Sequence, residues 1–146
     1  EHNMASIWDG IDNPELDKRS GMRLPYLYPG KFLLRTKRIA SYPSQKNPRD
    51  HWFRVDFEII EGAQQGVDQV SWVVNLSRGK LALSDIRAFV KALMGEEVAI
   101  TSGTMDELTS ADQPASGLLV RCDAINKKTE AGGDFTQTFW SVAEEV

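Results

Sequence analysis

A basic and aromatic stretch, residues 31–54, holds the side chains best suited to chemistry. It contains seven lysine and arginine residues against one acidic residue, a local charge of +6. The chain of 146 residues carries a net charge of −4 at pH 7, so the rest of it sums to −10. The rings interleaved with these charges are those of Phe32, Tyr42, His51, Trp52 and Phe53. Such a stretch could attract a phosphate backbone and offer rings on which nucleic-acid bases stack.

The same stretch also has a purely structural interpretation. Lysine and arginine side chains on a pair of solvated strands keep a sheet edge from pairing with other chains. From these residues alone, neither interpretation is preferred.

Enzymatic chemistry has little support in the sequence. The side chains other than carboxylates that could bind a metal are His2, His51 and Cys122, too few for a zinc cluster. No phosphate-cradling glycine loop and no nucleophile elbow is found. Asp56 and Glu58 have the spacing of paired acids in a two-metal nuclease, but we favour a role as cross-strand partners of Arg54 or Lys37. The prediction is a protein that is not an enzyme and needs no metal or cofactor.

The size and composition are those of one ordinary globular domain. Hydrophobic residues make up 41% and charged residues 26% of the chain, which suffices for a single buried core. No apolar run is long enough to cross a membrane. No signal peptide is recognised, and residues 1–3 ahead of Met4 are interpreted as a cloning remnant. The lone cysteine, Cys122, excludes an internal disulfide and fits a reducing compartment.

Two strands are predicted within the basic stretch, separated by a polar loop at 43–50. The second, residues 51–61, alternates strictly, and its inward side chains are expected to be Phe53, Val55, Phe57 and Ile59. The first, residues 31–42, alternates imperfectly, because Phe32, Leu34 and Thr36 share one face and Ile39 falls on the other. A strand that changes its buried face midway is expected to bend at a bulge.

Three more strands and a helix are predicted downstream. The strands are placed at 68–76, 118–125 and 135–142, the helix at 84–94, and a glycine-containing hairpin loop at 126–134. Ser84 is expected to cap the start of the helix and Gly95 its end. Residues 96–116 are expected to form an irregular excursion with a turn of helix. The fold prediction is therefore mainly β, a five-stranded OB-fold-like barrel with one helix between strands three and four. An antiparallel sheet with one packed helix would show the same order.

An outward tryptophan beside arginine is the strongest binding signal. Trp52 and Arg54 share the outward face of a strand whose inward face is already filled, which suggests base stacking with neutralisation of the backbone. The alternative is that an N-terminal arm, residues 1–27, covers the ring. The predicted nucleic-acid-binding residues are Arg35, Lys37, Arg38, Trp52, Arg54, Arg121, Lys127 and Lys128. The last two are placed in the hairpin loop that flanks the ligand groove of OB-folds. Trp72 and Phe89 are predicted to be core residues.

The body of the chain, residues 28–142, resembles a known family. The motifs are Tyr28-Pro-Gly-Lys-Phe32, Trp52-Phe-Arg-Val-Asp-Phe-Glu-Ile-Ile-Glu-Gly62, a helix ending in Leu93-Met-Gly95, Gly117-Leu-Leu-Val-Arg121, and a closing hairpin through Gly132, Gly133 and Trp140. These are similar to the small OB-fold single-stranded-DNA-binding proteins of tailed bacteriophages. The resemblance implies sequence-tolerant binding of single-stranded DNA in phage-type replication or recombination, without catalysis or cofactor, in the cytoplasm of a bacterial host.

Three points of organisation remain as expectations. The chain is divided into an extended arm at 1–27, an OB-fold domain at 28–142 and a short acidic C-terminus at 143–146. That terminus, Glu144-Glu145-Val146, is far shorter than the acidic tails with which many such proteins recruit partners, so tail-mediated recruitment of replication or recombination proteins is not expected. The competing hypothesis is a protein-interaction or assembly module that self-associates through Ile7, Trp8 and Ile11 of the arm.

Overall fold

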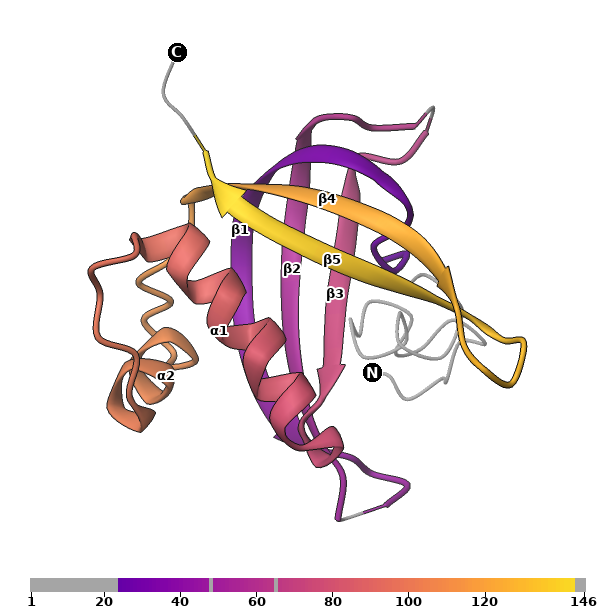
Figure 1. The fold of residues 1–146 in the computed structure, drawn as a ribbon. Helices are drawn as coiled ribbons and strands as arrows, with labels where there is room; N and C mark the ends of the chain where they lie inside the picture. Colours follow the sequence, from indigo (N-terminus) through magenta and orange to yellow (C-terminus); the bar gives the residue numbers. More distant parts are fainter. Residues whose placement is uncertain (1–23, 48, 65, 144–146) are drawn as a thin grey trace, which may run out of the picture.

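The computed structural model describes residues 24–47, 49–64 and 66–143, and these form a mainly β fold (Figure 1). The strands are β1 (Gly30–Pro43), β2 (His51–Glu61), β3 (Gln69–Asn75), β4 (Leu119–Lys128) and β5 (Asp134–Val142). All pairings between these five strands are antiparallel, in the order β3-β2-β1-β4-β5. The prediction of five antiparallel strands is confirmed. The described strands do not close into a barrel, and β3 and β5 are the two edges of the sheet.

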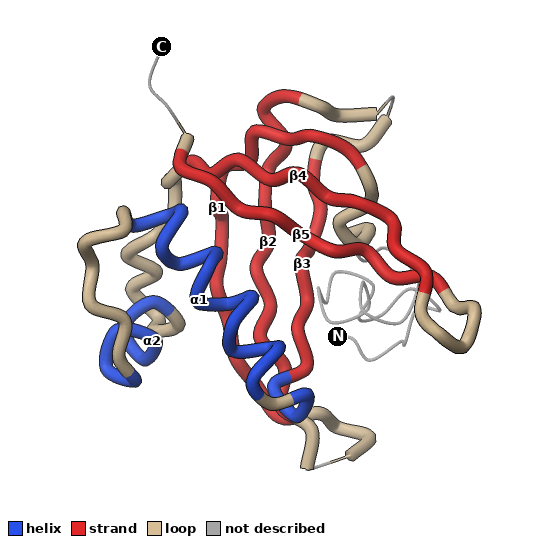
Figure 2. Tube along the Cα trace, viewed as in Figure 1, coloured by secondary structure: helices blue, strands red, loops and turns tan. Residues whose placement is uncertain are grey.

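The sheet folds over itself at β1. The first part of β1, from Gly30 to Arg35, pairs with β4, whereas its second part continues along β2 alone. In Figures 1 and 2, β4 and β5 accordingly cross in front of β1, β2 and β3, with the core between them. Trp140 on β5 reaches Trp72 on β3, their ring centroids being 4.7 Å apart. Two sheet edges are thus joined by side chains.

Helix α1 (Lys80–Met94) covers the open side between these edges, under β5 (Figure 1). Its buried side chains are Ala82, Ile86, Phe89, Val90, Ala92 and Leu93. Phe89 contacts both edges, with ring centroids 5.4 Å from Trp72 and 4.9 Å from Trp140. The predictions that Trp72 and Phe89 belong to the core are confirmed. None of the described helices is long and apolar enough to span a membrane.

The start of α1 differs from the prediction. The helix begins at Lys80 after a 3-10 turn at Leu76–Arg78, and its N-cap is Gly79. Ser84 lies inside the helix and is exposed. The physical reason is Ala82, which is buried and extends the apolar face of the helix by one turn. The prediction relied on the spacing of larger apolar side chains, and alanine is too small to stand out in that pattern. The C-terminal cap at Gly95 is confirmed, with its N–H donating to the Lys91 carbonyl.

A second helix, α2 (Ser102–Leu108), lies where only a turn of helix was expected. Thr101 and Thr104 form a reciprocal capping box at its start, which satisfies backbone donors that would otherwise lack partners. Leu108, the last residue of α2, is buried and packs its side chain into the hydrophobic core. The prediction of a single helix between strands three and four is therefore incomplete, because both α1 and α2 lie there.

The bulge predicted in β1 is confirmed. The register with β2 shifts between Leu33 and Leu34 and again between Thr36 and Arg38. The second shift leaves Lys37 without an opposite residue, so that Thr36 and Ile39 are both buried although they are three residues apart. An extra residue of this kind bends the strand, which allows β1 to serve both halves of the sheet.

Gln113 secures the strand beside this bulge. Its side-chain oxygen accepts the Ile39 N–H at 2.7 Å, and its amide nitrogen donates to the Ile39 carbonyl at 2.8 Å. The same nitrogen also donates to the Ser110 carbonyl at 2.8 Å. Gln113 thus substitutes for a neighbouring strand at the point where β4 has left β1.

The β4–β5 hairpin is longer than predicted, and its loop is shorter. Residues 126–128 pair with residues 134–136 instead of lying in the loop. The turn is closed by Thr129, whose N–H donates to the Gly133 carbonyl at 2.7 Å and whose hydroxyl accepts the Gly133 N–H at 3.0 Å. Because this turn is tight, the polar residues before it can extend both strands.

The last residues of the predicted arm join the sheet edge. Leu27 is buried, its N–H donates to the Ser71 carbonyl, and the Ser71 N–H donates to the Pro25 carbonyl, both at 2.8 Å. The arm residues proposed for self-association, Ile7, Trp8 and Ile11, lie outside the described residues, as do residues 144–146.

Substitution of Gly62 is expected to be the most disruptive change in the loop between β2 and β3. Gly62 has φ +96°, and a Cβ there would lie 2.2 Å from the Lys31 carbonyl oxygen. We expect Gly62→Ala to lower the free energy of unfolding, measured by urea denaturation, by about 3 kcal/mol. Gly66→Ala is the control, because Gly66 has φ +81° with nothing within 4 Å and should cost only about 1 kcal/mol. Equal effects would contradict the contact with Lys31.

Removal of the Gln113 side chain should leave the N–H and C=O of Ile39 without partners. We expect Gln113→Ala to lower the free energy of unfolding by about 2 kcal/mol. The control is Gln64→Ala in an exposed loop, which should change it by less than about 0.5 kcal/mol. A loss for Gln113→Ala as small as that of the control would show that the bulge does not depend on this side chain.

Candidate nucleic-acid interface

The bulge in β1 exposes three basic side chains that strict alternation would have divided between the two faces. Arg35, Lys37 and Arg38 are all exposed, while Thr36 between them is buried. A two-residue period would have placed Arg38 on the side of Thr36. The extra residue at Lys37 turns Arg38 outward, where it lies opposite Asp56 of β2. Local backbone irregularity therefore concentrates the positive charge of this strand.

The cations on this face differ in how they are paired. Arg35 forms an ion pair with Glu58 across the β1–β2 pairing, with 2.9 Å between Nη1 and Oε1. Arg54 forms one with Asp56 on its own strand, with 2.8 Å between Nε and Oδ1. In the described part of the chain, Lys37 and Arg38 have no such partner. Asp56 and Glu58 are therefore ion-pair partners of arginines. The described residues contain no cluster of three side chains that could hold a metal ion.

Arg54 is held by a network that continues onto β3. Its Nη2 donates to the Ser71 hydroxyl at 3.1 Å, and that hydroxyl donates to Asp56 at 2.7 Å. Partial burial acts to lower the pKa of Arg54, but the hydrogen bond and charge of Asp56, assisted by Tyr42, raise it overall. The guanidinium is therefore charged and directed along the sheet. The Arg54 side chain holds Asp56 and Ser71 in place and is less available to a phosphate than the side chain of Arg38.

An aromatic pair lies at the end of the same face. Trp52 of β2 is half-buried and stands opposite Tyr42 of β1, which is exposed. Directly opposed residues in an antiparallel pair have Cβ atoms about 5 Å apart. On its other side Trp52 faces Asn75 of β3. Tyr42 was not among the predicted site residues, although the register of the β1–β2 hairpin could have identified it as the partner of Trp52.

The loop next to this pair adds two more cations. Lys46 and Arg49 are exposed in the connection between β1 and β2. The loop is closed by the Ser44 N–H, which donates to the Asp50 carbonyl at 2.9 Å, and is tied to the 3-10 turn by the Ser77 hydroxyl, which donates to the Arg49 carbonyl at 3.2 Å. These cations are therefore carried on a loop that is hydrogen-bonded at Ser44, Arg49 and Asp50 and that leads into β2, the strand of Trp52.

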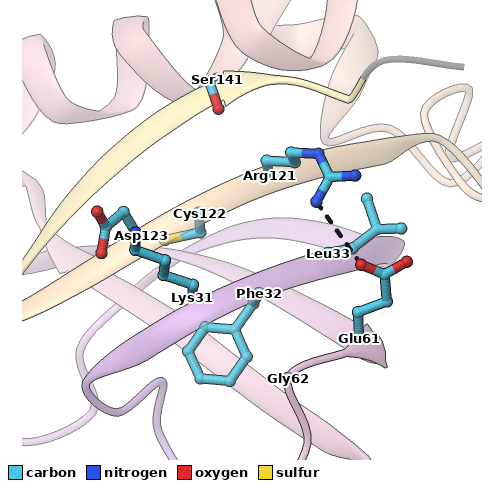
Figure 3. A pocket seen from close by; sticks show the side chains of 9 residues that line it. All are labelled: Lys31, Phe32, Leu33, Glu61, Gly62, Arg121, Cys122, Asp123 and Ser141. Carbon is cyan, nitrogen blue, oxygen red and sulfur yellow. Dashed lines mark ion pairs between the residues drawn. The ribbon is translucent and has the colours of Figure 1, made fainter.

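Arg121 continues this outward face onto β4, where it lines a cleft of about 380 Å³ over β1, β2, β4 and β5. In Figure 3 its guanidinium points toward Glu61, with 3.8 Å between Nη1 and Oε1. Arg121 is opposite Leu33 of β1, nine residues before the partner of Trp52. Cys122 also lines the cleft, and burial raises the pKa of its thiol to about 12, so the sulfur is protonated at neutral pH and unsuited to nucleophilic chemistry.

Lys127 and Lys128 occupy a separate place, the far end of β4. Both are exposed, and they lie within the strand instead of the loop. Six of the eight predicted residues therefore lie on one outward face. Arg35, Lys37, Arg38, Trp52 and Arg54 occupy it on β1 and β2, Arg121 continues it onto β4, and Lys127 and Lys128 lie apart.

Comparison with known proteins adds no assignment: no protein-family model matches the chain, and no curated protein is significantly similar to it.

The network around Arg54 predicts a structural role for this residue. Without the guanidinium, the half-buried carboxylate of Asp56 keeps, among the described residues, only the Ser71 hydroxyl as a hydrogen-bond partner. We expect Arg54→Ala to lower the free energy of unfolding in urea by about 1–2 kcal/mol. Arg38→Ala, which removes an exposed arginine from the same face, should change it by less than about 0.5 kcal/mol. The assignment fails if both variants are equally stable.

Proposed function

We propose that this protein binds single-stranded DNA in a sequence-tolerant way, on the outward face of β1 and β2. The observation that carries the proposal is the position of the Trp52–Tyr42 pair beside cations that have no ion-pair partner among the described residues. Aromatic rings accept any base by stacking, and lysine and arginine neutralise phosphates without reading sequence. The phage-type replication or recombination context rests on the family resemblance of residues 28–142.

The topology supports this assignment. A sheet ordered β3-β2-β1-β4-β5 with a helix between β3 and β4 has the strand and helix order of an OB-fold, a five-stranded and partly open barrel. We infer that the sheet is an open version of this barrel, in which the contact between Trp72 and Trp140 takes the place of edge pairing. OB-folds receive oligonucleotides on the face of strands two and three, between the loops β1–β2 and β4–β5, and the proposed site shares β2 and the β1–β2 loop with that region.

The charge arrangement fits a strand that passes along β1 toward the β1–β2 loop. Lys37 and Arg38 would contact phosphates first, the Trp52–Tyr42 pair would stack bases, and Lys46 and Arg49 would hold the backbone beyond them. Arg35 and Arg54 are already paired with carboxylates and contribute less. Since the rest of the chain is acidic, attraction of nucleic acid is confined to this face.

The test of stacking is Trp52→Ala in a fluorescence-anisotropy titration with labelled oligo-dT. Loss of one stacked base is worth about 1–3 kcal/mol, a rise in Kd of about 5- to 150-fold. Trp52→Phe keeps a ring and should recover part of the affinity, which separates stacking from a loss of fold. Undiminished binding by Trp52→Ala would remove Trp52 from the site. The absence of measurable wild-type binding at low salt would refute the proposed function.

The electrostatic part is tested by the double variant Lys37→Gln/Arg38→Gln. Each phosphate contact on a single strand contributes about 0.7 to the slope of log K against log salt concentration. The double variant should therefore reduce that slope by about 1.4. The control is Arg87→Gln, an exposed arginine of α1, which should leave the slope unchanged. An unaltered slope in the double variant would place the DNA on another surface.

A further inference from the structure

Three large apolar side chains are exposed together on the β4–β5 hairpin. Ile125 is 39% exposed, Phe135 is 43% exposed and Phe139 is 48% exposed. Phe139 is opposite Asp123 and Phe135 is opposite Lys127, so that Ile125 lies diagonally between the two rings. Diagonal neighbours of this kind are within reach of aromatic side chains. The three residues form one patch, which we call the hairpin patch.

The hairpin patch faces away from the core and from the proposed DNA site. The alternate residues of β5 point inward, where Trp140 contacts Phe57 of β2 at 5.7 Å between ring centroids. Because the inner face of β5 meets the inner face of β2, their outer faces point in opposite directions. The patch is therefore a second surface, separate from Trp52.

Two of the three patch residues, Ile125 and Phe135, lie where the hairpin pairs with no other described strand, whereas Phe139 is opposite Asp123, which pairs with β1. β1 pairs with β4 only as far as Ala124, so among the described residues the end of the hairpin is a two-stranded ribbon. Figure 1 shows it extending beyond the rest of the sheet. Two-stranded ribbons are only marginally stable in water. An exposed apolar patch that extends onto such a ribbon indicates that another molecule covers it.

The charges around the patch are self-complementary. Along β4, Asp123 lies two residues before Ile125 and Lys127 two residues after it. Along β5, Phe139 and Phe135 are placed in the same way about Gln137, which is opposite Ile125. A two-fold axis across the strands at Ile125 would bring Lys127 of one copy against Asp123 of the other, and Phe135 against Phe139. An isologous interface requires this kind of match.

We propose that the hairpin patch is a contact between two copies of this chain, packed face to face with their strands antiparallel. Burial of the two phenylalanines and Ile125 provides the apolar centre, and two Lys127–Asp123 pairs set the orientation. A nucleic acid fits this patch less well, because Asp123 lies within it and would repel a phosphate. The inference does not depend on the proposed function, since self-association is measured without DNA.

The test is sedimentation velocity of the full chain from about 1 to 500 μM, a range that covers weak and moderate dimers. The wild type should approach twice the 16.3 kDa monomer mass, and Phe139→Thr, a change that strands tolerate, should stay monomeric. Val142→Thr is the matched control, since Val142 is 51% exposed on the same strand but outside the patch, and it should dimerise like the wild type. A monomeric wild type, or a dimer that persists in Phe139→Thr, would overturn the proposal.

Orientation is tested by charge exchange. Lys127→Glu should weaken the dimer about ten-fold or more, because Asp123 of the other copy then faces a like charge. Adding Asp123→Lys to it should restore the Kd to within about three-fold of the wild type. Failure of the double variant to recover would exclude the antiparallel arrangement. Reduced oligo-dT affinity in Phe139→Thr, with wild type and variant both monomeric, would instead identify the patch as a nucleic-acid surface.

Discussion

The fold depends on one aromatic cluster that joins the two edge strands of the sheet, β3 and β5. These two strands do not pair through their backbones in the described sheet. Trp140 of β5 lies 4.7 Å from Trp72 of β3 and 4.9 Å from Phe89 of α1, measured between ring centroids. Aromatic pairs at such separations contribute about 0.5–1.5 kcal/mol each beyond the burial of their apolar surface. The β1–β4 pairing joins the two halves of the sheet on one side, and because β3 and β5 do not pair in the described sheet, these rings and α1 hold the other side together.

This closure through side chains explains why β1 must bend. One strand pairs with β4 at its start and with β2 to its end, so it has to turn from one half of the sheet into the other. The extra residue at Lys37 produces the turn, and Gln113 satisfies the backbone that it leaves unpaired. The same irregularity directs Arg38 to the surface. The basic face is thus a consequence of how the core is enclosed.

Local patterns predicted much of this structure, whereas contacts distant in sequence did not emerge from them. Strict alternation identified β2, and the change of buried face at Ile39 identified the bulge, because both are properties of neighbouring residues. The pairing of Gln113 with Ile39 joins residues 74 positions apart, and no local period encodes it. Likewise, the outward position of Arg54 was predictable, but its engagement by Ser71 depends on the register between β2 and β3.

The contact between the inner faces of β2 and β5 also determines whether their two outer faces can bind partners at the same time. Since Trp140 packs against Phe57, the outer side of β5 and the outer side of β2 are directed apart. A strand of DNA on Trp52 and a second copy of the chain on Phe139 would therefore not compete for space. Face-to-face dimerisation would leave both basic faces outward, so that one dimer could hold two segments of DNA. Two linked sites raise the effective concentration of each for a common strand, which would compensate for the small number of unpaired cations on a single face.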